Sequence, residues 1–336
     1  MDRVTDRIGS LGFGGSAIGN LYQPVAETLA FAALQAALEA GVSYIDTAPH
    51  YGFGLSEKRL GAALAELDPA HRVIVSSKVG RRLDPRPDAD LTEVRQGFVS
   101  PEPFESVFDY SYDAVMRSYE ASRTRLRREI DVLYVHDLGR RAHGDRHPQR
   151  FAEFMDGGYR ALRQLRDGGA VRAIGLGVNE CEVCEEALAH GDYDVMLLAG
   201  RYTLLEQGAL DTFLPLCQRR NVSVAVGGPY NSGILAQGVR RKVPLRYEYQ
   251  APPPQVIARV AAIEAICDAH GVPLAAAALQ FPLAHPQIIS VIAGMGNPDE
   301  VRGAKEWLTT PIPSALWNDL RCQGLVRLDA PLPVTA

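Results

Sequence analysis

Short apolar runs alternate with helical stretches along nearly the whole chain of 336 residues. Eight runs are rich in β-branched residues and bounded by Gly, Asp or Pro, which is the pattern of buried strands. They span residues 11–14, 42–46, 73–78, 131–136, 171–177, 194–199, 222–227 and 288–293. Amphipathic or Ala-rich stretches predict helices at residues 25–40, 56–66, 111–127, 157–168, 181–190, 208–220, 255–270 and 273–284. Because crossover helices join parallel strands, this order predicts an α/β protein with a closed (β/α)8 TIM barrel.

No linker, repeat or low-complexity stretch divides the sequence, so we expect a single barrel domain over residues 1–336. Two segments are longer than ordinary connections. One is residues 80–109, rich in Pro, Asp and Arg, and the other is residues 229–254, with three consecutive prolines near its end. Both follow a predicted strand end, and long connections in a compact domain are usually functional. We therefore expect them to overhang the barrel mouth as walls of the substrate and cofactor clefts.

The composition argues against several classes of function. The 35 basic and 40 acidic residues are interspersed and give a net charge of −5, so no basic surface suited to nucleic acid is expected. The first residues are polar and no apolar run has the length of a membrane span, so we expect neither a signal peptide nor a membrane anchor. Five cysteines without a framework spacing fit a reducing compartment, and a cytoplasmic protein is expected.

Four polar residues in the first half of the chain lie at or just after predicted strand ends. Asp46 ends the run VSYID, Tyr51 follows five residues later, Lys78 ends VIVSSK, and His136 ends IDVLYVH. The carboxyl ends of barrel strands meet at one face, where such barrels carry their chemistry. We therefore expect the four side chains to share one pocket.

These residue types together suit proton transfer. An ammonium group beside a phenol stabilises the phenolate and lowers its pKa from about 10. Lys78 would act on Tyr51 in this way, and Asp46 would keep Lys78 charged and oriented. A phenol tuned in this manner exchanges a proton in step with hydride transfer. Taken alone, however, Asp46 and Lys78 are equally compatible with a structural ion pair.

Two other motifs suggest different chemistry. GFGGSA at residues 12–17 matches the dinucleotide fingerprint, but no carboxylate ends a strand about twenty residues later, and the β/α units are too many for a Rossmann half. We interpret these glycines as a tight turn after the first strand. His143 and His147 follow His136 closely, but metal sites in barrels usually take ligands from several strand ends. We expect a solvated loop there and no metal site.

The motifs DTAPHYG, SSKVG and YVHD together resemble the aldo-keto reductases, and the likeness runs from about Leu11 to Val326. The resemblance implies a catalytic tetrad and a nicotinamide dinucleotide cofactor. The implied tetrad is Asp46, Tyr51, Lys78 and His136. The implied cofactor contacts are Asn179 at the nicotinamide carboxamide, and Asn231, Ser232 and Gly233 of PYNSGIL along the pyrophosphate.

The chain departs from the family pattern at the adenosine end of the cofactor. NADP-dependent members carry a Lys-Ser pair and an Arg after strand eight, whereas this chain reads IAGMGNPDE. Gly294 and Met295 stand at the pair, Gly296 follows, and Glu300 stands at the Arg position. A carboxylate repels a 2′-phosphate but can accept a hydrogen bond from a ribose hydroxyl. We therefore expect NAD in preference to NADP.

A second departure concerns the aromatic residue that often stacks on the nicotinamide. Gly227 stands at its position, and Tyr202 or Tyr230 are the residues that we expect to compensate. The family's usual Gln after strand six corresponds to Ala199.

The segments GFGGSAIGNLY, LAGRYTLLEQGALD and PYNSGIL resemble the aldose 1-dehydrogenases that act on L-fucose, D-arabinose and related sugars. They resemble the pyridoxal 4-dehydrogenases as closely. Both groups act on cyclic hemiacetals, so we expect NAD-dependent oxidation of a sugar hemiacetal to a lactone, with pyridoxal as the alternative substrate. His50 and Arg81 are expected to contact the substrate. NADPH-dependent carbonyl reduction and a regulatory nucleotide-binding barrel with little turnover remain open alternatives.

Overall fold

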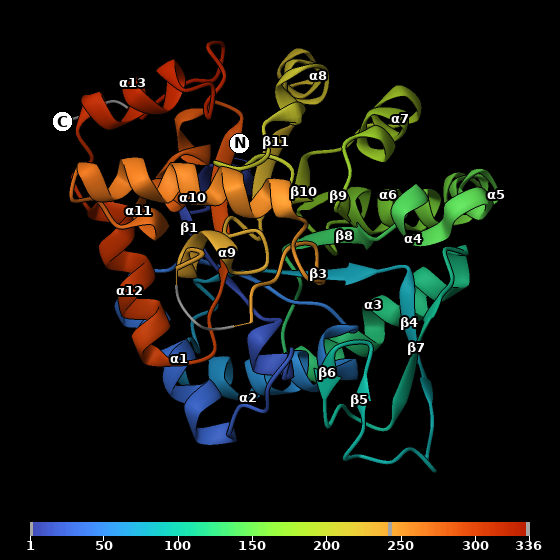
Figure 1. Ribbon diagram of the computed structural model, residues 1–336. Helices are drawn as coiled ribbons and strands as arrows, with labels where there is room; N and C mark the ends of the chain where they lie inside the picture. The colour runs from blue at the N-terminus through green and yellow to red at the C-terminus, as the bar shows by residue number, and fades with distance from the viewer. Residues whose placement is uncertain (1–2, 241–243, 334–336) are drawn as a thin grey trace.

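Eight parallel strands close into a barrel in the computed structural model, which describes residues 3–240 and 244–333 (Figure 1). Around the barrel the order is β1-β12-β11-β10-β9-β8-β3-β2. The strands are β1 Leu11–Gly14, β2 Tyr44–Asp46, β3 Ile74–Val79, β8 Val132–His136, β9 Ala173–Val178, β10 Val195–Ala199, β11 Ser223–Gly227 and β12 Ile288–Gly294. The predicted barrel is confirmed, and each strand lies within two residues of its predicted bounds.

Helices on the outside connect successive strands. The eight predicted helices correspond to α1 Glu27–Glu39, α2 Leu55–Leu67, α3 Tyr112–Leu126, α6 Tyr159–Asp167, α7 Glu182–His190, α8 Phe213–Arg220, α10 Pro254–Ala269 and α11 Leu274–Gln280. Further helices lie outside the predicted ranges, namely α4 Arg140–His143, α5 His147–Glu153, α9 Ile234–Gln237, α12 Pro298–Thr309 and α13 Ser314–Cys322. Within the described ranges no single helix is long and apolar enough to cross a membrane; α10 and residues 274–284 pass that test only as a pair bent by 104°.

The alternation of side chains along the strands decides what faces the barrel interior. Tyr44 and Tyr134 are fully buried in the interior cluster, whereas Ile45 packs outward against the helices. Because successive side chains on a strand point to opposite faces, Asp46 and His136, each two residues beyond one of these tyrosines, also point inward. They therefore lie at the carboxyl end of the barrel, above its apolar interior.

The segment 80–109 has regular structure of its own. It forms two small antiparallel sheets, beside the barrel at the lower right of Figure 1. Their strands are β4 Arg81–Pro85 with β7 Phe104–Phe108, and β5 Val94–Arg95 with β6 Phe98–Val99. Phe98 is buried, with its ring centroid 5.2 Å from that of His50 and 6.2 Å from that of Tyr51. The second sheet thus forms a wall of the pocket that holds Tyr51.

Candidate active site

Lys78 and Asp46 form a buried ion pair at the carboxyl end of the barrel. The Lys78 Nζ lies 2.6 Å from the Asp46 Oδ2 and donates a second hydrogen bond to the Thr47 carbonyl oxygen at 2.9 Å. Only 2% of the Lys78 side chain and 5% of the Asp46 side chain are exposed. Such a pair holds the ammonium in one position, because both partners are shielded from water and mobile counterions.

Tyr51 is held over this ammonium by an unusual turn. The Lys78 Nζ lies 4.7 Å from the Tyr51 ring centroid. The next residue, Gly52, has a φ of 63°, and a Cβ there would lie 2.5 Å from the Gly19 carbonyl oxygen. Only glycine fits such a position, so the chain turns tightly and fixes the tyrosine before α2 begins. No described residue is hydrogen-bonded to the Tyr51 hydroxyl, which leaves it available to a substrate.

His136 completes the cluster from β8. Its ring is nearly perpendicular to that of Tyr51, with the centroids 5.9 Å apart. Burial, and secondly the charges of Lys78 and Arg81, hold the pKa of His136 well below its usual range. The imidazole is therefore neutral at physiological pH and can donate one hydrogen bond without carrying charge. The structure thus brings all four predicted residues into one cluster.

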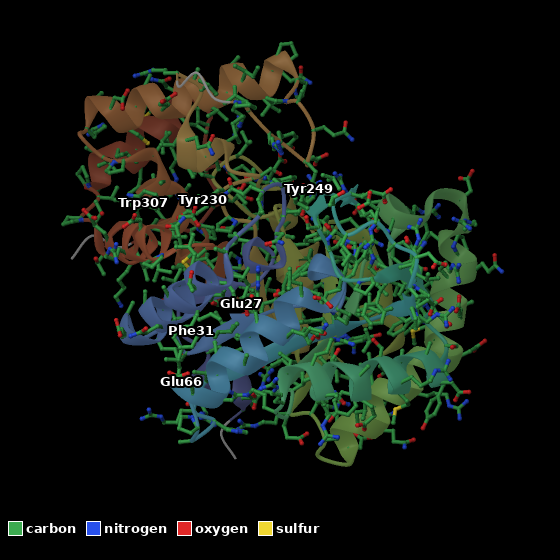
Figure 2. The ribbon with its side chains drawn as sticks, turned by 90° about the horizontal axis from the view of Figure 1, so that it is seen from below. Glu27, Phe31, Glu66, Tyr230, Tyr249 and Trp307 are labelled. Carbon is green, nitrogen blue, oxygen red and sulfur yellow. The ribbon has the colours of Figure 1, made fainter. Side chains whose placement is uncertain are left out.

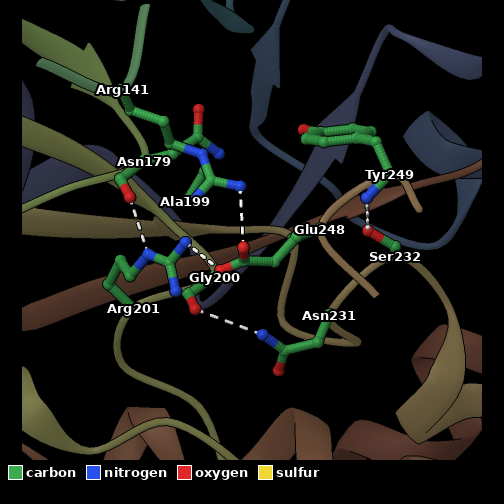
Figure 3. A pocket seen from close by; sticks show the side chains of 10 residues that line it. Arg141, Asn179, Ala199, Gly200, Arg201, Asn231, Ser232, Glu248 and Tyr249 are labelled. Atoms are coloured by element: carbon green, nitrogen blue, oxygen red, sulfur yellow. Dashed lines mark hydrogen bonds and ion pairs between the residues drawn. The ribbon is translucent and has the colours of Figure 1, made fainter. Parts of the chain in front are cut away.

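A small hollow lies beside this cluster, at the ends of β9, β10 and β11 (Figure 3). Of the predicted cofactor residues, Asn179, Asn231 and Ser232 line it. The lining also includes Arg141, Ala199, Gly200, Arg201, Gly228, Glu248 and Tyr249. The polar side chains around this hollow suit a ligand with amide and hydroxyl groups.

Two glycines beside the hollow leave open space where other residues would carry a side chain. Gly228 has a φ of 55°, and among the described atoms a Cβ there would meet only the Gly200 nitrogen, at 4.0 Å. Gly233 has a φ of 97°, and a Cβ there would meet only the Gln237 Nε2, at 3.7 Å. Open space of this kind lets a phosphate approach the backbone closely. Gly228 lines the hollow and Gly233 follows Ser232, which also lines it, so the backbone there has room for the predicted cofactor phosphates.

Glu300, which is predicted to lie near the adenosine end of the cofactor, is in the first turn of α12. Its Oε2 accepts a hydrogen bond from the Gly296 nitrogen at 2.6 Å, and its own nitrogen donates to the Asn297 Oδ1 at 3.0 Å. Asp299 stands beside it, so two exposed carboxylates occupy this helix end. Glu300 thus has a capping role that sequence analysis did not anticipate, in addition to its predicted place near the ribose.

Comparison with known proteins agrees with this geometry. The sequence pattern of the Aldo/keto reductase family matches residues 10–321. The chain belongs to this family. It is 42% identical over 328 residues to a pyridoxal 4-dehydrogenase from Microbacterium luteolum, with 94% of each chain covered. It is 38% identical over 316 residues to a D-threo-aldose 1-dehydrogenase from a Pseudomonas species, with 93% of each chain covered.

A solved structure extends the comparison to the fold. The holo form of an aldo-keto reductase from Bacillus halodurans superimposes with a TM-score of 0.70 at 25% sequence identity. The match covers 95% of this chain and 92% of the other. The barrel is therefore an aldo-keto reductase barrel over nearly its whole length.

Below the tetrad of this aldo-keto reductase lies a column of hydroxyl groups that sequence analysis missed. Ser76 donates to the Asp46 Oδ1 at 2.7 Å, Tyr44 lies 3.0 Å from Ser76, and Tyr134 lies 3.0 Å from Tyr44, all measured between oxygens. The column orients Asp46 and satisfies hydroxyls that would otherwise be unpaired in the interior. Alternation along β2, β3 and β8 was the available signal, because each of these residues lies two positions before a tetrad residue.

The predicted pKa of Tyr51 is wrong in direction. Burial, followed by the negative charge of Asp46, raises the pKa of Tyr51 well above its usual value. A phenolate in this poorly solvated pocket beside a carboxylate is costly, and this cost outweighs the attraction of the Lys78 ammonium. Tyr51 is therefore a protonated phenol in this structure.

Two predicted cofactor residues have structural roles instead of free side chains. The Asn231 amide bridges two loops, since its Oδ1 accepts from Thr203 at 2.6 Å and its Nδ2 donates to the Gly200 carbonyl at 3.1 Å. The Met295 side chain is 1% exposed and belongs to the main apolar core. Met295 can therefore contact a cofactor only through its backbone, while the neighbouring Gly294 is exposed.

Neither tyrosine expected to replace the stacking aromatic lies at the hollow. Tyr202 is fully buried and packs against Phe281 at 5.5 Å between ring centroids. Tyr230 packs edge-on to Trp307, well away from Tyr249 (Figure 2). Both predictions are therefore wrong, because these rings turn toward the apolar packing around the barrel.

The aromatic ring that does line the hollow is Tyr249, in the segment 229–254. Glu248 and Tyr249 have φ values of 51° and 66°, which are uncommon for residues other than glycine. Glu248 is held by ion pairs with Arg141, at 2.9 Å, and with Arg201, and Ser232 accepts from the Tyr249 nitrogen at 3.2 Å. These contacts hold Glu248 and Tyr249 at the hollow (Figure 3).

The two predicted substrate residues differ in how accessible their side chains are to a substrate. His50 is buried, and its Nδ1 lies 3.0 Å from the Ser106 Oγ, so part of its bonding capacity is already used. Arg81 lines a second cavity of about 260 Å³ and stacks 4.5 Å from the Phe108 ring centroid. Asn179 and Arg141 line both hollows. The second cavity therefore adjoins the first on the side of the first small sheet.

The region of His143 and His147 is not a solvated loop, which corrects the prediction. His143 is buried with its Nε2 2.8 Å from the Tyr110 hydroxyl. His147 is buried as well, with its Nε2 2.8 Å from Glu186. Within the described residues no group of three His, Cys, Asp or Glu side chains is arranged to hold a metal ion.

Proposed function

We propose that this aldo-keto reductase oxidises the anomeric carbon of a cyclic aldose hemiacetal, such as L-fucose or D-arabinose, to a lactone with NAD. The observation that carries the proposal is the cluster of Tyr51, Lys78 and His136 beside a hollow with bare glycine backbone. The similarity to a D-threo-aldose 1-dehydrogenase supports the choice of substrate class. A bound NAD would supply the hydride acceptor.

Each tetrad residue has a role in this proposal. His136, as a neutral imidazole, donates a hydrogen bond to the reacting oxygen and fixes its approach. Tyr51 accepts the proton of the hemiacetal hydroxyl as hydride leaves the anomeric carbon. Lys78 stabilises the negative charge that Tyr51 carries before it takes the proton, and Asp46 positions Lys78 through the 2.6 Å ion pair.

The raised pKa of Tyr51 predicts a pH dependence. Only the ionised phenol can accept a proton, and its fraction grows about tenfold per pH unit below the pKa. We expect kcat/KM for oxidation to rise steadily from pH 6 to 9 when initial rates of NADH formation are followed by absorbance. For reduction by NADH, where Tyr51 donates the proton, we expect no such rise. An oxidation rate that is independent of pH across this range would show that Tyr51 is not the base.

The preference for NAD is proposed from the Glu300 carboxylate in the first turn of α12. We expect Glu300→Arg to lower the ratio of kcat/KM with NAD to that with NADP by about tenfold or more, because an arginine adds a charged hydrogen bond to the 2′-phosphate. Asp299→Arg is the matched control, since it makes the same change of charge one residue away. An unchanged ratio in Glu300→Arg would refute this account of the adenosine end.

Pyridoxal is the second candidate substrate, and the 42% identity to a pyridoxal 4-dehydrogenase favours it. The two candidates share the reacting group, because pyridoxal also forms a cyclic hemiacetal. Carbonyl reduction with NADPH is disfavoured by Glu300. A regulatory barrel with little turnover is disfavoured by the assembled tetrad.

The test is NAD reduction by the purified protein with L-fucose, D-arabinose, L-galactose, D-glucose and pyridoxal, with NADP in parallel. Turnover of an aldose with NAD is the expected result. Turnover of pyridoxal alone would assign the protein to pyridoxal oxidation. If NAD bound and no hemiacetal were oxidised, the proposed function would be wrong.

A further inference from the structure

Asp137 lies between His136 and the cavity that Arg81 lines. Its Oδ2 is 3.6 Å from the His136 Nε2, and its side chain is 19% exposed on the lining of the 260 Å³ cavity. The distance is too long for a hydrogen bond between the two groups. The carboxylate therefore faces both the imidazole and the space beside it.

The backbone of Asp137 is held in a rare conformation. Its φ is 51°, which Asp and Asn adopt more readily than most other residues with a side chain. The Tyr110 hydroxyl lies 3.0 Å from the His136 carbonyl oxygen and 2.9 Å from that of Asp137, and the Asp137 nitrogen donates to Gly177 at 3.1 Å. Left-handed residues that the surroundings hold so firmly cluster at functional sites.

Among the described residues, hydrogen bonds reach one oxygen of the Asp137 carboxylate, Oδ2. Arg81 Nη1 donates to the Asp137 Oδ2 at 2.7 Å, and the Arg81 guanidinium is itself packed on Phe108. No described residue donates to the Oδ1. An ionised carboxylate accepts hydrogen bonds only, so the free oxygen is suited to a donor such as a hydroxyl group.

A substrate bound through its reacting oxygen to Tyr51 and His136 brings its neighbouring carbon toward this carboxylate. We propose that Asp137 selects substrates with a hydroxyl on the carbon next to the reacting carbon, by accepting a hydrogen bond from that hydroxyl. Arg81 acts as the positioning residue that fixes the carboxylate. This inference rests on the proposed function, and it identifies the feature of the hemiacetal that the site recognises.

Three pentoses test it, because D-arabinose, its C2 epimer D-ribose and 2-deoxy-D-ribose differ only at the hydroxyl in question. For the wild type we expect kcat/KM for D-arabinose to exceed that for 2-deoxy-D-ribose by about tenfold or more, the effect of a hydrogen bond to a charged group. D-Ribose should fall between them. Asp137→Asn keeps a residue that tolerates the left-handed backbone, and we expect it to reduce the ratio of kcat/KM for D-arabinose to that for 2-deoxy-D-ribose severalfold.

Binding provides the second readout. In a Tyr51→Phe background with NAD present, calorimetry should show tighter binding of D-arabinose than of 2-deoxy-D-ribose, and Asp137→Asn should remove most of the difference. The matched control is Asp84→Asn. Asp84 forms an ion pair with Arg82 on β4, so this variant makes the same change at another carboxylate paired with an arginine. The proposal is overturned if Asp137→Asn weakens the binding of both sugars equally. It is also overturned if neither wild-type turnover nor binding in the Tyr51→Phe background distinguishes D-arabinose from 2-deoxy-D-ribose. Distinction in binding without any turnover would refute the proposed function and support Asp137.

Discussion

Tyr51→Phe is expected to lower kcat for hemiacetal oxidation by about 10²–10⁴-fold, the usual contribution of a positioned acid or base. The substitution removes one hydroxyl to which no described residue is bonded, and it retains the ring between His136 and Phe98. The dissociation constant for NAD, measured by fluorescence or calorimetry, should therefore be unchanged.

The control for this substitution is Tyr112→Phe. Tyr112 lies at the start of α3, and its hydroxyl bonds to Gln164 at 2.7 Å on the outside of the barrel. This variant should keep wild-type kcat. Near wild-type turnover in Tyr51→Phe would end the assignment of Tyr51 as the proton acceptor.

Lys78→Met is expected to destabilise the protein by about 3–5 kcal/mol, because it leaves the Asp46 carboxylate charged, buried and unpaired. Thermal or urea unfolding measures this loss. Activity should fall as well, since the negative charge on Tyr51 would lose its cation. Methionine matches the lysine stem in length, so the cavity contribution to the loss is small.

The double variant Asp46→Asn with Lys78→Met separates stability from catalysis. Asparagine removes the unpaired charge and can still accept the hydrogen bond from Ser76. We expect the double variant to regain much of the lost free energy of unfolding and none of the lost activity. Recovery of activity in the double variant would show that Lys78 acts only as the structural partner of Asp46.

The barrel and the tetrad were predictable because both depend on patterns that are local in sequence. Each barrel strand is a short apolar run, and Asp46, Lys78 and His136 stand at the ends of three such runs. Period two along these strands also fixes Ser76, Tyr44 and Tyr134 inside the barrel. Their hydrogen bonds to Asp46 follow from strand register, which the sequence does not state.

The errors arose where long-range packing decides the outcome. Tyr202 packs against Phe281 instead of lining the hollow, and the Met295 side chain lies in the core. Burial of these large apolar groups stabilises the fold and decides where they lie, whatever motif they belong to. The direction of the Tyr51 pKa depends on desolvation, which no motif reports. Tyr249 reaches the hollow through ion pairs of Glu248 with arginines distant in the chain, and the sequence gives no sign of them.

Transfer of deuterium from the anomeric carbon tests the central claim most directly. L-Fucose or D-arabinose labelled with deuterium at C1 is incubated with the enzyme and NAD, and the NADH and sugar product are analysed by mass spectrometry. The account predicts NADH that carries one deuterium, a lactone without the label, and transfer that is slower by about 10²–10⁴-fold with Tyr51→Phe. Label retained in the sugar while NADH forms, or an unlabelled lactone formed without labelled NADH, would contradict hydride transfer from the anomeric carbon.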